Sequence, residues 1–205
     1  MNLDLHTTAV VITDPQVDVL SPDGALADLL HAQVAKRRVV DNLRALRDHA
    51  ERAGVPVLYS TLERRAKHTR APATNAPIYQ LIHERGAMLE GAGAAIVPEL
   101  APTERTTLAS PRGGMMAFGT TDLDALLRAR GARTLIMGGM VLNLCLEANL
   151  RAAVDLGYEI ILVSDATATI SDAAHEAALA SLALIAAKIV TTAELLPALT
   201  RAAAA

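Results

Sequence analysis

Residues 134–163 read TLIMGGMVLNLCLEANLRAAVDLGYEIILV, and this stretch carries the pattern that decides the fold. Residues 134–137 form an apolar run typical of a strand, residues 145–156 show helical spacing, and residues 159–164 form a second apolar run. Gly157 separates the helix from the second run, as a glycine at a helix C-terminus does. The stretch therefore predicts a β–α–β unit with two parallel strands.

The same alternation of strand-like and helix-like segments runs through the rest of the chain. Further strands are predicted at 7–13, 55–60, 106–110 and 187–190, and further helices at 27–53, 121–130 and 172–183. Because such alternation implies parallel pairing with helices on both faces, we predict an α/β fold with a six-stranded, mainly parallel sheet. A length of 205 residues fits a single domain, 1–205. Residues 61–93 are less regular and are interpreted as a loop with a short helix that covers a site.

The amino-acid composition indicates which binding partners and which cellular compartment to expect. Hydrophobic residues make up 52% of the chain but aromatic residues only 2%, so the core is expected to be aliphatic. With few rings to stack on bases and a net charge of −3, the chain is not expected to bind nucleic acid. The single cysteine indicates a reducing compartment. The N-terminus lacks a signal-peptide pattern and no apolar run reaches the ~18 residues of a membrane span, which predicts a cytoplasmic protein without a membrane partner.

The strongest local signal is the turn GGMVLNLC at 138–145, where a strand ends in two glycines and a cysteine opens the next helix. Free N–H groups and the positive end of the dipole at a helix start favour an anion. Cys145 is therefore expected to have a lowered pKa and to act as a nucleophile. The same N–H groups could hold the oxyanion of a tetrahedral intermediate. The alternative is that Cys145 is a small buried hydrophobic residue.

Two further candidates follow predicted strand ends. Asp14 ends the first strand and could act as a general base, although an Asp before Pro15 is also a common turn former. Arg112 follows the third strand and could fix a carboxylate or stabilise negative charge, unless it is an ordinary solvated arginine. Because ligands bind at the carboxyl ends of parallel strands, one fold would bring Asp14, Arg112 and Cys145 together.

At these positions the chain resembles the isochorismatase-like cysteine hydrolases, a group that includes nicotinamidase, N-carbamoylsarcosine amidohydrolase and the ureidoacrylate amidohydrolases. The resemblance runs over nearly the whole length. The matching segments are DPQVD at 14–18, GVPV at 54–57, IVPEL at 96–100, AFGTTDL at 117–123, the cysteine turn at 139–145, DAT at 165–167 and TTAE at 191–194. It implies a three-layer α-β-α, Rossmann-like fold and a homodimer or homotetramer, in which a neighbouring subunit often completes the pocket.

The resemblance also implies the roles of individual residues. The family's catalytic trio is an Asp, a Lys and a Cys, which Asp14, Arg112 and Cys145 match by position, with Arg in place of Lys. A cis peptide bond is implied between Met140 and Val141, so that the N–H groups of Val141 and Cys145 face the substrate oxygen. The residues expected around the oxyanion and the substrate are Gln16, Met116, Phe118, Met140, Val141 and Leu142.

The implied mechanism is nucleophilic attack by the cysteine on an amide-type carbon, followed by hydrolysis of a thioester. The exchange of Lys for Arg112 leads us to expect an Asp14 with a lowered pKa, which is a weaker base. Turnover is then expected to rise in Arg112→Lys. Met116 and Leu142 stand where Ser and Thr are common in the family, so we expect an apolar pocket floor.

No cofactor or metal is expected. The metal site of the nicotinamidases needs an Asp-x-His pair after the second strand, and residues 60–65 here read STLERR. The expected partner is a small-molecule substrate. Two other functions remain open, a catalytically weakened binding or scaffold protein and a vinyl-ether hydrolase that uses the Asp as an acid. A dinucleotide-binding domain is disfavoured because no GxGxxG motif follows the first strand.

Overall fold

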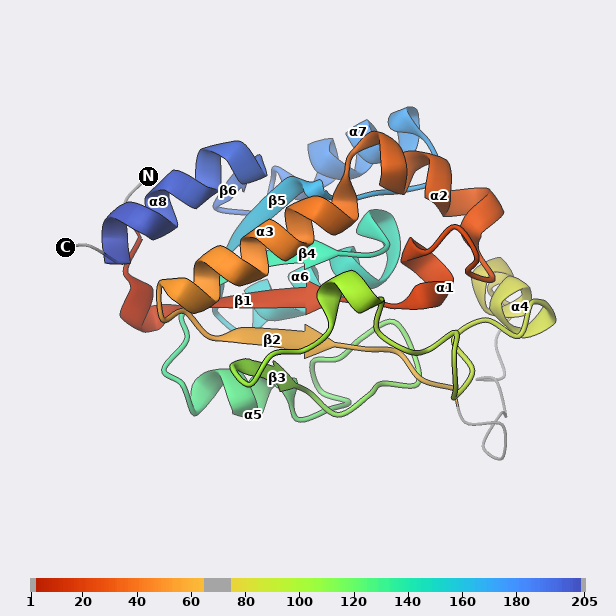
Figure 1. Ribbon diagram of the computed structural model, residues 1–205, viewed down its shortest axis with the longest axis horizontal. Helices are drawn as coiled ribbons and strands as arrows, with labels where there is room; N and C mark the ends of the chain where they lie inside the picture. Colours follow the sequence, from red (N-terminus) through yellow and green to blue (C-terminus); the bar gives the residue numbers. More distant parts are fainter. Residues whose placement is uncertain (1–2, 65–74, 204–205) are drawn as a thin grey trace.

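A computed structural model describes residues 3–64 and 75–203, and in it six strands pair in parallel in the order β3-β2-β1-β4-β5-β6 (Figure 1). All five strand pairs are parallel, so the predicted sheet is confirmed. The strands are β1 (Thr8–Thr13), β2 (Val57–Ser60), β3 (Thr106–Leu108), β4 (Thr134–Gly139), β5 (Glu159–Thr167) and β6 (Lys188–Val190).

Both faces of the central strands are buried, which gives the three layers that the resemblance implies. In β1, Val10 and Ile12 belong to one apolar cluster, whereas Ala9 and Val11 belong to the other. Helices α3 (Val39–Arg52) and α8 (Thr192–Ala203) contribute to the first cluster. Helices α5 (Leu123–Arg128), α6 (Glu147–Asp155) and α7 (Asp172–Leu182) contribute to the second. Alternate side chains of one strand thus reach different helical layers.

The predicted helix at 27–53 is wrong in one respect, because it is two helices. Helix α2 (Ala27–Lys36) ends before Arg38, whose φ of 53° is left-handed, and α3 begins at the next residue. A left-handed residue changes the chain direction, so that α2 packs on α1 (Val17–Leu20) while α3 packs on the sheet. Neither Gly nor Pro marks this break in the sequence.

The helix predicted from Cys145 to Leu156 is also corrected. Residues Leu142–Leu146 form a π-helical turn in which Leu144 has the non-helical angles φ −130° and ψ −105°, and α6 begins only at Glu147. Cys145 therefore lies in an irregular turn before the α-helix and does not open it. The predicted cover segment contains α4 (Pro77–Glu84), while its residues 65–74 lie outside the described part of the chain. None of the described helices has the length and hydropathy of a membrane span.

Candidate active site

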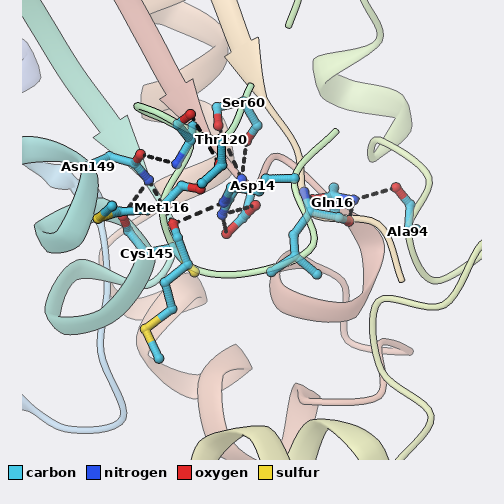
Figure 2. A network of polar contacts seen from close by, with 12 residues as sticks. Asp14, Gln16, Ser60, Ala94, Met116, Thr120, Cys145 and Asn149 are labelled. Atoms are coloured by element: carbon cyan, nitrogen blue, oxygen red, sulfur yellow. Dashed lines mark hydrogen bonds and ion pairs between the residues drawn. The ribbon is translucent and has the colours of Figure 1, made fainter. Parts of the chain in front are cut away.

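The three residues predicted from strand ends meet at the carboxyl edge of the sheet. Strand β1 lies between β2 and β4, and its last residue, Thr13, is in register with Ser60 and Gly139. Asp14 follows β1 directly. Arg112 reaches the same place because its backbone forms a bridge with Leu62, beyond the end of β2. Figure 2 shows the side chains of Asp14, Ser60 and Cys145 grouped at this edge.

The guanidinium of Arg112 is almost completely buried, at 1% exposure, and makes five hydrogen bonds. Its Nη2 donates to both carboxylate oxygens of Asp14, at 2.7 and 2.6 Å. Its Nη1 donates to the carbonyl and the hydroxyl of Ser60, at 3.0 and 3.1 Å, and its Nε donates to the carbonyl of Met115 at 3.0 Å. Each of the three guanidinium nitrogens of Arg112 therefore donates to at least one protein acceptor, and Arg112 also interacts with the thiol of Cys145.

Burial dominates the protonation of the other two groups. It raises the pKa of Asp14 above its usual range, although the charge and hydrogen bonds of Arg112 act in the opposite direction. Burial, together with the negative charge of Asp14, raises the pKa of the Cys145 thiol from 9.0 to about 12, although Arg112 lowers it. Both sequence-based expectations are therefore wrong, because desolvation outweighs the ion pair at Asp14, and desolvation with the charge of Asp14 outweighs Arg112 at Cys145.

The cysteine turn begins with a glycine that the sheet requires. Gly139 has a φ of 112°, and a Cβ atom there would lie 2.0 Å from the carbonyl oxygen of Thr13. That same oxygen accepts the N–H of Met140 at 2.8 Å. The Met140–Val141 peptide bond is cis, as the resemblance implies. Within residues 3–64 and 75–203 the N–H of Val141 has no hydrogen-bond partner.

Asn149, on α6, joins the cysteine turn to the Arg112 loop and is completely buried. Its Nδ2 donates to the carbonyls of Cys145 and Met115, at 2.7 and 3.0 Å, and its Oδ1 accepts the N–H of Ala117 at 2.7 Å (Figure 2). The carbonyl of Met115 thus accepts from both Asn149 and Arg112. This network fixes the loop that carries Arg112 against the turn that carries Cys145.

The side chain of Gln16 binds the backbone of neighbouring segments. Its Nε2 donates to the carbonyls of Leu62 and Ala94, at 2.8 and 2.6 Å, and its Oε1 accepts the N–H of Leu62 at 2.9 Å. Both amide N–H groups are therefore taken, and Gln16, at 1% exposure, ties the end of β1 to two other segments. Its predicted contact with substrate is not supported by this arrangement.

A small cavity of about 40 Å³ lies against Asp14 and Cys145. Of the six residues expected around the substrate, only Val141 lines it. Met140, Leu142 and Phe118 are packed in the cores, and Met116 is 46% exposed. The expectation that Met116 and Leu142 make the pocket floor apolar is therefore wrong, since neither side chain lines the cavity.

The cavity is nevertheless apolar, for a reason that the sequence did not reveal. The predicted cover segment closes it, because Ile78, Tyr79 and Ile82 of α4 all line it. Its other apolar walls are Val19, Leu26, Leu62, Met88, Met115, Val141 and Leu144. Tyr79 adds a polar contact, since its hydroxyl accepts the N–H of Met115 at 3.2 Å.

Sequence reasoning missed Ser60, Tyr79, Met115 and Asn149. Two of them carried a usable signal, since Ser60 ends a predicted strand beside the one that Asp14 follows, and Asn149 stands four residues after Cys145 on the predicted helix. Tyr79 and Met115 reach the site only through tertiary packing, so no local sequence signal marks them. Among the described residues, no group of three His, Cys, Asp or Glu side chains is arranged to hold a metal ion.

Comparison with known proteins identifies the family. The Isochorismatase domain model matches residues 8–194. A ureidoacrylate amidohydrolase of Rhizobium rhizogenes is 32% identical over 173 residues, which cover 78% of this chain and 70% of the relative. An isochorismatase family protein of Bacillus subtilis is 29% identical over 179 residues, 87% of each chain. The crystal structure of a cysteine hydrolase from Pseudomonas syringae pv. phaseolicola superimposes with a TM-score of 0.85 at 25% identity and covers 98% of this chain and 96% of that chain. The chain belongs to the isochorismatase family and is an isochorismatase-like hydrolase.

Proposed function

We propose that this protein is a metal-independent cysteine hydrolase that cleaves the C–N bond of a small amide, ureido or carbamoyl compound through a thioester at Cys145. One observation carries the proposal. The carboxylate of Asp14, held by Arg112 at 2.7 and 2.6 Å, and the thiol of Cys145 interact within one buried site at the carboxyl edge of the sheet. The names of the ureidoacrylate amidohydrolase and the cysteine hydrolase that the chain resembles support the same chemistry.

In the first half-reaction, Asp14 takes the proton of the Cys145 thiol while the sulfur forms a bond to the substrate carbonyl carbon. The thiol is neutral at rest because its pKa is about 12, so proton transfer accompanies the attack. The raised pKa of Asp14 makes its carboxylate a stronger base. The electron pair of the C=O bond moves to the oxygen, which accepts hydrogen bonds from the N–H groups of Val141 and Cys145.

Collapse of this intermediate breaks the C–N bond, and the leaving nitrogen takes the proton from Asp14. Ammonia or an amine departs and a thioester remains on Cys145. In the second half-reaction, water gives a proton to Asp14 as its oxygen attacks the thioester carbon. The C–S bond breaks, the acid product leaves, and the sulfur regains its proton from Asp14. The N–H of Val141, which has no partner among the described residues, supports its assignment as an oxyanion donor.

Arg112 is assigned an electrostatic and positioning role. Its positive charge lowers the pKa of both Asp14 and Cys145, against the effect of burial, and so favours the negative charge that passes between them. Its five hydrogen bonds hold the carboxylate in one orientation beside the thiol. Preorganised charge of this kind needs no rearrangement during the reaction.

The test is ammonia release from a panel of small amides, ureas and carbamoyl compounds, with Cys145→Ser and Cys145→Ala as controls. We expect turnover of at least one compound in the parent protein and its loss in both variants. Release that persists without the cysteine would contradict the proposal. Cleavage of a vinyl ether by both variants would support the vinyl-ether hydrolase, because that reaction needs Asp14 but no thiol. An inert parent protein would support the binding or scaffold function.

A further inference from the structure

The geometry points to a small, neutral, aliphatic amide as the substrate, and to discrimination against substrates that carry a carboxylate. This inference rests on the proposed cysteine hydrolysis and adds the chemical class of the acyl group. Three features of the described residues carry it. They are the bonding of every Arg112 nitrogen to the protein, the hydrocarbon wall of the cavity, and the apolar space into which the cavity would extend.

Every guanidinium nitrogen of Arg112 already donates to an acceptor of the protein. Its Nη2 donates to both carboxylate oxygens of Asp14, its Nη1 donates to Ser60 and its Nε to Met115, and its side chain also interacts with Cys145. Its positive charge is already opposed by the carboxylate of Asp14 at 2.6 Å. A substrate carboxylate that paired with Arg112 would have to compete with Asp14, the residue to which we assign proton transfer.

The rest of the cavity offers no replacement for Arg112. Apart from Asp14, Cys145 and Tyr79, the described side chains that line it are aliphatic or thioethers, and none of them is Lys, Arg or His. A carboxylate placed there would lose its water and lie beside the negative charge of Asp14. Burial of an unpaired charge is strongly unfavourable, whereas an alkyl group gains from the same wall.

The cavity also favours an acyl group that is small and apolar. Its 40 Å³ is close to the space of a single water molecule, so a substrate must displace side chains to enter. Ile78, Leu144, Val141 and Leu26 line both this cavity and an open groove of about 530 Å³ beside α4. The groove is itself lined mainly by apolar side chains, among them Leu29 and Leu81. An alkyl chain that displaces Ile78 or Leu144 therefore remains in apolar surroundings.

The experiment compares butyramide with succinamate, which has a carboxylate where butyramide has a methyl group. In the parent protein we expect kcat/KM for butyramide to exceed that for succinamate by at least about 100-fold, because the carboxylate loses its water without gaining a partner. Equal values, or a preference for succinamate, would overturn the inference.

A matched pair of variants on α4 tests the wall itself. Ile82 lines the cavity, whereas its neighbour Leu81 lines only the outer groove. Ile82→Arg supplies the missing cation, so the preference for butyramide over succinamate is expected to fall by at least about tenfold. Leu81→Arg is expected to keep the parent ratio. A fall of the same size in both variants would contradict the assignment, and thermal midpoints of both check folding.

A binding measurement separates this inference from the proposed function. Butyramide should protect Cys145 from alkylation by iodoacetamide at pH 9.5 at concentrations at least about 100-fold lower than succinamate, for the desolvation reason given above. If neither compound is hydrolysed but butyramide alone protects, the proposed reaction fails and the preferred ligand class stands. If ammonia is released through Cys145 but both compounds protect equally, the reaction stands and the neutral class is wrong.

Discussion

The phenolic oxygen of Tyr79 lies 3.2 Å from the backbone nitrogen of Met115 and accepts its hydrogen bond. The carbonyl of the same Met115 accepts from Arg112 Nε at 3.0 Å. One peptide segment thus connects α4, which covers the cavity, with the guanidinium that holds Asp14. This connection makes the position of the cover helix and the geometry of the buried ion pair interdependent.

Tyr79→Phe should therefore lower turnover as well as stability. The variant keeps the ring in the cavity wall but removes the acceptor for the N–H of Met115, which costs about 1 kcal/mol and corresponds to a loss of roughly 3- to 10-fold in kcat/KM. Tyr158→Phe is the control, because its hydroxyl donates to Asp124 at 2.7 Å far from the cavity. Kinetics and thermal midpoints of both variants check this. An equal loss of kcat/KM in the two variants would contradict the connection.

Asn149→Ala should be among the most damaging substitutions outside the proposed reacting groups. The carbonyl of Cys145 and the N–H of Ala117 would lose this partner, and the carbonyl of Met115 would keep only its bond from Arg112. We expect a loss of about 2–4 kcal/mol in the free energy of unfolding, measured in urea. Asn143→Ala, on an exposed residue of the cysteine turn, should change it by less than about 0.5 kcal/mol. Similar values for the two variants would rule out this role for Asn149.

Arg112→Lys should destabilise the protein and should not raise turnover. A lysine has three donors on one nitrogen and cannot replace the bonds to Asp14, Ser60 and Met115 together, so we expect a loss of about 1–3 kcal/mol. The sequence led us to expect faster turnover through a stronger base, but burial already raises the pKa of Asp14. Steady-state kinetics on a simple amide decide the point. A clear increase in kcat would show that Arg112 does weaken the base.

Asp14→Asn should have opposite effects on thiol reactivity and on turnover. The negative charge of Asp14 adds to the effect of burial and raises the pKa of Cys145, so its removal leaves Arg112 as the opposing charge and lowers that pKa from about 12. Alkylation of Cys145 at pH 9 should become faster, while turnover falls by about 10²- to 10⁴-fold with the loss of the base. Asp41→Asn, on the exposed side of α3, is the control. Slower alkylation in Asp14→Asn would contradict the sign of the interaction.

The sequence allowed the fold to be predicted because each strand is a short apolar run closed by a turn residue. Strand ends alone placed Asp14, Arg112 and Cys145 at one edge, which the structure confirms. The break at Arg38 was not predictable, because a left-handed arginine has no local signal. The π-helical turn around Leu144 was hidden for a similar reason, since its residues also fit a helical pattern.

The surroundings of the site were harder to predict from the sequence than the residues that form it. Protonation depends on burial, and the sequence does not state how far Asp14 and Cys145 lie from water. The cavity wall depends on α4, which is distant in sequence from the strand ends. Leu142 and Met116 were assigned to the pocket by family position, yet one side chain turns into the core and the other into solvent.

The most direct test of the central claim is the intact mass of the protein during turnover of an amide substrate, quenched in acid. We predict a mass increase equal to the acyl group, located on the peptide that contains Cys145 and released by hydroxylamine. The increase should be absent in Cys145→Ser. Turnover without any adduct in the parent protein, together with continued turnover in Cys145→Ser, would contradict the account.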